Sequence, residues 1–305
     1  MLKFIIKRSI WGIITIILVV TLVFFMIHAI PGSPFSSQSN LPENIKNNVL
    51  NKYNLNKPLP EQLLSYFNNM IHGDLGMSIK NNGRTVNSII TEHLPISMII
   101  GATSMLLCMI IAIPLGVLAA IHESKIIDWI CRGFSIITAS TPGFVIAVLL
   151  QYFICVKLKW LPSFASNNWK GLILPIFILT LYPFAIIFQL IRNNMIEELK
   201  KDYIIMATME GIPQNKIIYN YALKNACIPM ITYISPVIVS VLTGSFAVEK
   251  VFGIPGIGRY FIVSVLDSDY TVVLGLTVFF TMLMVTFNLI SDVVYKVLNP
   301  KIKME

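Results

Sequence analysis

Charged residues are scarce in this sequence. Only 12% of its 305 residues are Asp, Glu, Lys or Arg, whereas 55% are hydrophobic. Soluble domains contain about 25% charged residues, so the composition excludes an ordinary soluble protein and indicates membrane helices. The net charge of +8 does not predict a nucleic-acid partner, because basic residues flank the apolar runs, as they do on the cytoplasmic side of membrane proteins.

Sequence patterns for metal, disulfide or nucleotide chemistry are also missing. The four cysteines and four histidines are widely spaced and show no metal-ligand pattern. The run Gly253–Tyr260 has the glycine spacing of a phosphate loop, but it lacks the Lys-Ser/Thr pair that would reach phosphates and magnesium. No nucleophile stands beside a base. We therefore predict that this chain has no catalytic site and binds no metal or cofactor.

Ionisable residues are nearly absent from the apolar runs themselves. His28 lies near one end of the first run, and Asp292 lies near the end of the last. Charged groups at membrane depth are costly and usually mark ion or proton pathways. A proton-coupled carrier is therefore a poor interpretation, and uphill transport would need energy from another polypeptide.

What the sequence does contain is a series of apolar runs of about twenty residues, each long enough to cross ~30 Å of hydrocarbon. The first is too long for the apolar region of a signal peptide and no cleavage site follows it, so we expect a retained helix. The excess of Lys and Arg on one side predicts that both termini are cytoplasmic, although Lys157–Lys170 opposes this orientation. The predicted spans are Ile10–Ile30, Ile96–Ile121, Ser135–Val156, Leu172–Ile191, Ile228–Val248 and Thr271–Ile290.

The spans divide the chain into two predicted regions. Residues 1–95 comprise the first helix and a polar outer segment, Pro31–Pro95, with short amphipathic helices such as Pro60–Ile71. Residues 96–305 form a core of five helices. In the third span, Thr138–Phe144 combines hydroxyl residues with Pro and Gly, a pattern equally compatible with a kink at a pathway and with ordinary helix packing.

A charged loop, Arg192–Asn225, separates the fourth and fifth spans. Gly211 suits the left-handed residue that ends a helix, and Pro213 suits the first turn of the next one. Two amphipathic helices with a fixed bend could lie on lipid headgroups or in a groove of a protein. Acidic residues favour the protein, because anionic lipid would repel them. The apolar faces are predicted as Ile204, Ile205, Thr208 and Met209 in Lys200–Glu210, and as Ile217, Ile218, Tyr221 and Ala222 in the second helix.

This loop resembles that of the B-type permease subunits of binding-protein-dependent ABC importers for oligopeptides, dipeptides and nickel. The family loops read R-x-S-M-x-E, D-Y-x-x-x-A-x-x-x-G and A-L-R-N-A-x-x-P. The residues in register are Arg192, Met195, Glu197, Asp202, Tyr203, Ala207, Gly211, Ala222, Leu223, Asn225, Ala226 and Pro229. Further similar stretches are Asn56–Gln62, His72–Ser78, Glu249–Tyr260, Asp267–Gly275 and Asn288–Ile302, so the resemblance extends over essentially the whole chain.

Departures from the family pattern are few. Ile205 and Met206 occupy the Glu and Ala positions of the general Glu-Ala-Ala motif. The remaining departures are conservative or isolated: Asn194 replaces Ser, Lys224 and Lys301 replace Arg, and Thr271 replaces Pro.

The resemblance implies an all-α membrane protein with six transmembrane helices, the type I ABC importer permease fold. A large extracellular segment would follow helix 1, and a coupling-helix insert, residues 192–227, would lie in the cytoplasm between helices 4 and 5. The implied partners are a second, C-type permease, two cytoplasmic ABC ATPases that bind ATP and magnesium, and an extracellular substrate-binding lipoprotein or periplasmic protein. The location would be a bacterial cytoplasmic membrane, with membrane lipid around the helices and no nucleic acid.

The resemblance also implies roles for individual residues. It implies ATPase coupling by Glu197, Asp202, Tyr203, Ala207, Gly211, Lys216, Leu223, Lys224 and Asn225. It implies docking of the binding protein at the outer pieces that contain Gly73, Asp74, Gly76, Pro255, Gly256 and Gly258. Small or hydroxyl-bearing residues are candidates for the pathway, although such residues also serve as ordinary helix-packing contacts: Thr141, Ser240, Thr243 and Gly244.

The implied activity is that of a permease subunit that forms half the translocation pathway of an ATP-driven importer for oligopeptides or dipeptides. Nickel or other metal chelates and glutathione are alternative cargoes, because such systems share these permease signatures. A stand-alone channel or secondary carrier, and a non-transporting receptor subunit, remain as further alternatives.

Overall fold

The computed structural model describes residues 2–29, 57–81, 83–165, 169–242 and 246–298. Within these ranges the regular structure is helical, apart from one isolated bridge between Met77 and Thr85. Among the described residues, four helices are long and apolar enough to cross a membrane, and the number rises to as many as six if each of two bent helix pairs is one span. The four are α1 (Leu2–Ala29), α4 (Val86–Ile121), α7 (Lys170–Leu199) and α14 (Tyr270–Leu298).

The span predicted as Ser135–Val156 must be corrected, because it is neither continuous nor confined to those residues. Helix α5 (Ile126–Ser140) begins earlier than predicted, and a bend of 103° separates it from Gly143–Lys157. The second arm consists of α6 (Gly143–Leu150) and the π-helical η2 (Gln151–Lys157). Pro142 explains the break, because proline lacks an N–H and drives the preceding residue out of the helical region. Thr141 accordingly is extended, with φ −94° and ψ 125°.

Two other predicted boundaries also change. Helix α4 begins at Val86 rather than Ile96, so the end of the predicted outer segment is helical and Pro95 lies inside that helix. The predicted span Ile228–Val248 contains α11 (Ile228–Leu242) and the start of a separate helix, α12 (Phe246–Phe252), which α13 (Ile257–Leu266) follows. In the outer segment, the expected helix Pro60–Ile71 is confirmed as α3 (Leu59–Ile71).

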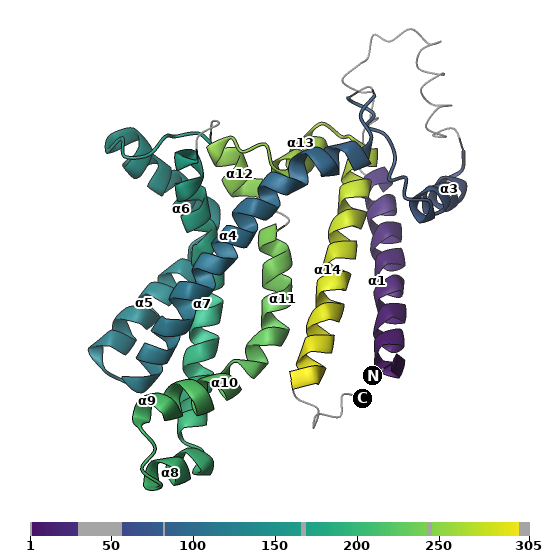
Figure 1. The fold of residues 1–305 in the computed structure, drawn as a ribbon. Helices are drawn as coiled ribbons and strands as arrows, with labels where there is room; N and C mark the ends of the chain where they lie inside the picture. Colours follow the sequence, from purple (N-terminus) through teal and green to yellow (C-terminus); the bar gives the residue numbers. More distant parts are fainter. Residues whose placement is uncertain (1, 30–56, 82, 166–168, 243–245, 299–305) are drawn as a thin grey trace. The chain divides into compact units, whose positions relative to one another are not determined.

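The chain forms two compact units, and the first consists of Met1–Pro95 with Tyr260–Val285. Here α1 lies beside the N-terminal part of α14, with Phe24 of α1 buried in the same cluster as Leu274 and Val278 (Figure 1). Helix α3 packs its apolar face on this cluster. Unit 1 thus includes Tyr260–Val285, which the sequence analysis assigned to the second predicted region. The division into residues 1–95 and 96–305 stays a prediction.

A buried carboxylate holds unit 1 together. Asp269 directly precedes α14 and accepts a bond from the backbone N–H of Val272 at 3.5 Å, as helix N-caps do. It also accepts bonds from the Ser78 hydroxyl at 2.5 Å and from the Ile79 N–H at 3.1 Å. These contacts tie the loop that precedes α4 to the start of α14.

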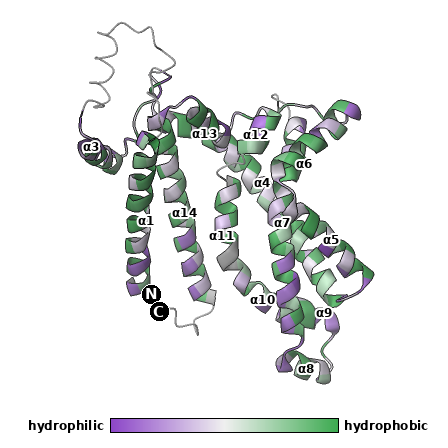
Figure 2. Ribbon diagram, turned by 180° about the vertical axis from the view of Figure 1, so that it is seen from behind, coloured by the Kyte–Doolittle hydropathy of each residue, from purple (hydrophilic) through white to green (hydrophobic). Residues whose placement is uncertain are grey.

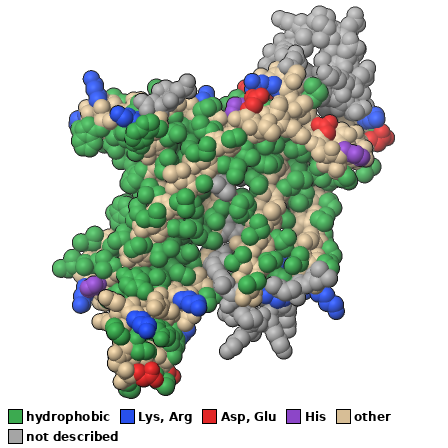
Figure 3. Space-filling view, viewed as in Figure 1, with side chains coloured by type: hydrophobic (Ala, Val, Ile, Leu, Met, Phe, Trp, Pro, Cys, Tyr) green, Lys and Arg blue, Asp and Glu red, His purple; other side chains and the backbone are tan. Residues whose placement is uncertain are grey.

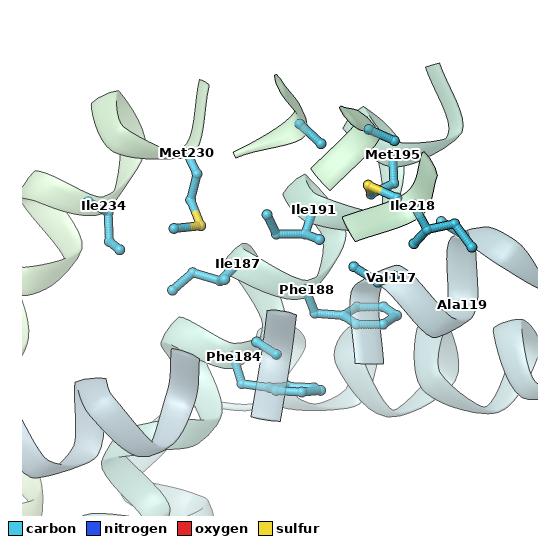
Figure 4. Close-up of a cluster of buried hydrophobic side chains, with 14 of the residues drawn as sticks. Val117, Ala119, Phe184, Ile187, Phe188, Ile191, Met195, Ile218, Met230 and Ile234 are labelled. Carbon is cyan, nitrogen blue, oxygen red and sulfur yellow. The ribbon is translucent and has the colours of Figure 1, made fainter. Parts of the chain in front are cut away.

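The second unit consists of Ile96–Arg259 and Thr286–Glu305, of which the structure describes residues up to 298. Helix α7 runs through its core and contacts α5, α6, α10, α11 and α12. Figure 4 shows Phe184, Phe188 and Ile191 of α7 in a cluster of buried apolar side chains with Val117 of α4. Pro183 lies inside α7 and is buried too.

Hydrophobic side chains dominate the surfaces of the long helices. Figure 2 shows green, apolar residues over most of α1 and α5, and Figure 3 shows apolar side chains across the visible surface of unit 2 between its charged ends. Large exposed residues such as Trp11 on α1 and Trp129 and Ile137 on α5 belong to these surfaces. In water such extensive apolar exposure would cause aggregation, whereas lipid is its natural solvent.

The close approach of helices in unit 1 gives a direct test of this packing. A Cβ atom at Gly275 would lie 2.8 Å from Val86 Cγ1 and 3.0 Å from the Leu75 carbonyl oxygen, whereas a Cβ at Gly133 of α5 would meet nothing within 4 Å. We expect Gly275→Ala to destabilise the protein by about 1–3 kcal/mol through overpacking. Gly133→Ala should be neutral or slightly stabilising. Thermal unfolding in detergent measures both, and equal midpoints would contradict the packing described.

Candidate functional site

The charged loop forms a helical hairpin at the C-terminal end of α7, which we call the knob (residues 200–226; Figure 1). Its first helix is α8 (Asp202–Met209). Its second arm is continuous through α9 (Gln214–Lys216), the π-helical η3 (Ile217–Ala222) and α10 (Leu223–Ala226).

The bend between the two arms is fixed by backbone geometry. Gly211 has φ +77°, which confirms the predicted left-handed residue. Its N–H donates to the Thr208 carbonyl at 3.1 Å, and the next N–H, of Ile212, donates to the Ala207 carbonyl at 3.2 Å. These bonds satisfy carbonyls at the end of α8. Pro213 precedes the first turn of the second arm rather than lying inside it, and its carbonyl accepts bonds from Lys216 and Ile217.

The inner face of the knob is continuous with the core of unit 2. Ile204 and Ala207 of α8 are buried together with Ile191 and Met195 of α7. The predicted face of α8 is therefore wrong in part: Ile204 is buried, but its predicted neighbours Ile205, Thr208 and Met209 are exposed. The small side chain of Ala207 allows α8 to pack closely on the core of unit 2. The spacing of large apolar residues did not predict this contact. In the second arm Ile217, Ile218 and Ala222 are buried as predicted, whereas Tyr221 is exposed.

A hydrogen-bond network joins the knob to α7. The Tyr203 hydroxyl donates to Glu198 Oε2 at 2.6 Å, and Asn225 Nδ2 donates to the Tyr203 oxygen at 3.0 Å. Lys201 Nζ donates to the other oxygen of Glu198 at 2.5 Å. Burial and then the bond to Glu198 raise the pKa of Tyr203, so this hydroxyl remains a donor. The network links the second arm of the knob, through Asn225 and then Tyr203 of the first arm, to the carboxylate of Glu198 in α7.

The outer face of α8 is apolar and exposed. Ile205, Met206 and Met209 are 46%, 61% and 82% exposed. At 100° per residue they lie opposite the buried pair Ile204 and Ala207. The predicted residues Glu197, Asp202, Lys216 and Lys224 are also exposed, while Leu223 and Asn225 are partly buried. The knob thus presents an apolar patch with charged residues of both signs around it, as Figure 3 shows at the lower end of unit 2.

An ion pair that the sequence analysis did not single out lies between α5 and α7. Arg192 Nε and one terminal nitrogen donate to the two carboxylate oxygens of Asp128, at 2.5 and 2.6 Å. Their side chains are only 11% and 1% exposed. The Ser124 N–H also donates to Asp128, at 3.0 Å. The sequence signal for this pair was Asp128, an isolated acidic residue among apolar neighbours. A buried charge requires a partner, so this residue could have predicted an ion pair.

Of the outer residues predicted for docking, Gly256 lies against a second buried carboxylate in unit 2, that of Glu249. Glu249 accepts bonds from the Ser97 hydroxyl at 2.8 Å and from the Arg259 N–H at 2.7 Å. A Cβ at Gly256 would collide with this carboxylate. Gly256 and Gly258 are buried and only Pro255 is exposed. The two glycines therefore shape the loop rather than form its surface. In unit 1, Gly73 and Asp74 are exposed and Gly76 packs against Thr271.

The structure does not assemble the predicted pathway residues into one site. The Thr141 hydroxyl donates to the Ile137 carbonyl at the break of the bent pair, and the Ser240 hydroxyl donates to the Val237 carbonyl within α11. Thr243 and Gly244 lie outside the described residues. Their role in a pathway stays a prediction.

Comparison with known proteins identifies the family. Residues 112–304 match the inner membrane component of binding-protein-dependent transport systems, and residues 1–101 match the N-terminal region of such membrane components. The chain belongs to this family. This result confirms the resemblance to ABC importer permeases of the B type.

Individual relatives match over their full length. The permease is 38% identical to the oligopeptide transport system permease protein OppB of Salmonella typhimurium, over 99% of this chain and 100% of that one. It is 36% identical to the dipeptide transport system permease protein DppB of Bacillus subtilis, over 100% of this chain and 99% of that one. The permease is therefore an integral membrane component of a transport system.

The buried ion pair gives a prediction for stability. Asp128→Asn would leave the Arg192 guanidinium buried without its counter-charge, so we expect a loss of about 3–5 kcal/mol. The matched control is Glu123→Gln, whose partner Lys200 lies at 3.4 Å with both side chains largely exposed. That change should cost less than about 1 kcal/mol. Thermal unfolding of both variants in detergent tests this, and similar midpoints would refute the structural role of Asp128.

Proposed function

We propose that this permease forms half of the translocation pathway of an ATP-driven importer of oligopeptides or dipeptides, and that the knob couples it to a cytoplasmic ATPase. The exposed apolar face of α8 carries the coupling assignment, because a rigid helix with three exposed large apolar residues fits a groove in a protein partner. Full-length similarity to oligopeptide and dipeptide permeases supports peptides as the cargo.

The knob is built to transmit movement rather than to absorb it. Its inner face shares one apolar cluster with α7, α4 and α11, and interiors packed this way transmit strain because they are poorly compressible. The Tyr203 hydroxyl adds a bond to Glu198 of α7 and accepts one from Asn225 of the second arm. When ATP draws two ATPase subunits together, a force on α8 would therefore move α7 and its neighbours. The ATPases would supply all ATP and magnesium chemistry.

The charges around the apolar patch would orient the ATPase. Lys216 and Lys224 are exposed on the second arm, while Glu197 and Asp202 are exposed near the first. Charges at the rim of an interface contribute mainly to association rate and specificity. We expect acidic groups of the ATPase opposite the lysines, while the apolar patch supplies most of the affinity.

This assignment implies an orientation of the chain and further partners. The knob and both termini would lie in the cytoplasm, where Lys3, Lys7 and Arg8 precede the apolar part of α1. The segment between α1 and α4 and the turn between α12 and α13 would lie outside. Gly73 and Asp74 of the first and Pro255 of the second would be the exposed candidate contacts of the substrate-binding protein. A second, C-type permease would complete the pathway.

The bend of the knob is the first point to test. A β-branched residue is strained at the φ of +77° found at Gly211 by roughly 1–3 kcal/mol. Gly211→Val should relax by changing the angle between the arms, and we expect ATP-dependent peptide uptake in vesicles to fall at least tenfold while the permease remains in the membrane. Gly211→Asn should retain most uptake, because asparagine tolerates this conformation.

The chain offers a matched control for this substitution. Gly83 has φ +87° and, like Gly211, has nothing within 4 Å of an added Cβ, but it lies far from the knob in the sequence. Gly83→Val imposes comparable local strain and should leave uptake near the wild-type value. If Gly211→Val transports as well as Gly83→Val, the bend is not required for coupling.

The apolar patch is the second point to test. Met209 is 82% exposed, so Met209→Asp should not unfold the permease, but it would place a charge where the ATPase is expected to bury this surface. We expect the ATPase to be lost from the purified complex. Asn215→Asp adds the same charge at another exposed position of the knob and should retain the ATPase. Retention by both variants would exclude the patch as the docking face.

A further inference from the structure

Unit 1 contains a cavity of about 240 Å³ that is separate from the knob. It lies between the C-terminal end of α1, helix α3 and the first turn of α14. Its lining combines apolar side chains, such as Phe24 and Leu274, with the polar side chains of Tyr66, Asn69 and Asp74. The volume is slightly below the about 300–1,000 Å³ of small-molecule pockets, so the cavity suits a small ligand or one end of a larger one.

The cavity contains a hydroxyl group that lacks a partner. The oxygen of Tyr66 is buried and makes no hydrogen bond within the part of the chain that the structure describes. Leaving such a group unsatisfied destabilises the protein, because the buried hydroxyl has lost its bonds to water. Burial and then the nearby charge of Asp74 raise the pKa of Tyr66, so the hydroxyl stays protonated. Unsatisfied buried polar groups in native proteins call for an explanation, and a bound ligand provides one here.

The charged side chain of the lining is an acceptor. Asp74 is the only Asp, Glu, Lys or Arg among the described lining residues. One of its carboxylate oxygens accepts a bond from the Gly76 N–H at 2.8 Å, which leaves the second oxygen for a ligand. His28 Nδ1 lies 2.8 Å from the Phe24 carbonyl oxygen. Because a carbonyl only accepts, Nδ1 carries the proton in the neutral ring and Nε2 is an acceptor.

Aromatic rings complete the lining. The His28 ring lies 4.3 Å from the ring of Phe24 and 6.2 Å from that of Tyr270, measured between centroids. The faces of aromatic rings attract cations. The negative charge, the acceptors and the rings all favour a ligand that is positively charged and donates hydrogen bonds.

We propose that this cavity binds a primary ammonium group attached to a small apolar group. In this binding mode the ammonium ion donates to Asp74 and to the Tyr66 oxygen, and the apolar part packs on Phe24 and Leu274. Two molecules carry this chemistry to a membrane importer: the amino terminus of a short peptide, and the ethanolamine headgroup of a phospholipid.

Benzylamine is a suitable probe, and benzyl alcohol is its neutral counterpart. The full transporter complex is placed in phosphatidylcholine nanodiscs, without ATP, because the choline headgroup has no N–H donor. Saturation-transfer NMR then measures binding. We expect a Kd on the order of 1 mM for benzylamine, as a ligand of this size allows, and at least tenfold weaker binding of benzyl alcohol.

Variants locate the binding to this cavity. Asp74→Asn should weaken benzylamine binding about tenfold and Tyr66→Phe about threefold. The matched control is Asp267→Asn, because Asp267 is an exposed carboxylate of the same unit that does not line the cavity; binding should not change. The proposal is overturned if Asp74→Asn binds benzylamine as tightly as Asp267→Asn does, or if the alcohol binds as well as the amine.

Competition distinguishes the two sources. Displacement of benzylamine by Ala-Phe but not by N-acetyl-Ala-Phe assigns the site to a peptide amino terminus. Loss of benzylamine binding when phosphatidylethanolamine replaces phosphatidylcholine assigns it to lipid. If neither competes, the proposal is wrong. The binding assays use no ATP, so their outcome is independent of whether the knob couples to an ATPase or the importer carries peptides.

Discussion

A carboxylate buried in a membrane protein has no water to satisfy it, so its hydrogen bonds must come from the chain itself. Asp269 of unit 1, and Asp128 and Glu249 of unit 2, meet this requirement, and each does so with donors distant in sequence. Asp269 binds Ser78, Asp128 binds Arg192, and Glu249 binds Ser97. Each carboxylate thereby fastens two segments that apolar contacts alone would allow to slide, because lipid is as apolar as the helix surfaces.

The same constraint explains why the knob can act as a rigid attachment. Helix α7 is held to α5 by the Asp128–Arg192 pair, and the knob begins only a few residues beyond Arg192. Glu198, near the end of α7, receives its bonds from Tyr203 and Lys201 of the knob. The end of α7 therefore carries polar contacts at Arg192 and Glu198, and the buried side chain of Met195 lies between them in the sequence. The contacts of Glu198 with the knob would have to break before α8 could move independently of α7.

Much of this arrangement was predictable from the sequence, and the failures have physical causes. Apolar runs predicted helices, and Gly211 and Pro213 predicted the bend, because the local chain decides these features. The break at Thr141 was left open, since proline in membrane helices is often tolerated. The buried face of α8 was assigned incorrectly because the prediction relied on the spacing of large apolar residues. Ala207 is buried against the core of unit 2 although its side chain is small. The partners of Asp128 and Asp269 are 64 and 191 residues away, which no local pattern reveals.

The structure shows where the two departures from the Glu-Ala-Ala motif lie on α8. Ile205 and Met206 replace Glu and Ala, and both lie on the exposed face of α8 rather than in the core. Substitutions inside the core would alter packing, whereas these alter only what a partner contacts. Under the proposed function, the ATPase that binds this permease must offer an apolar groove where the general motif presents a carboxylate. Met206 and Met209 are flexible and polarizable, and such side chains adapt to irregular grooves. The affinity between permease and ATPase would therefore depend on the apolar shape of this patch, while Lys216 and Lys224 would contribute to the association rate and to specificity.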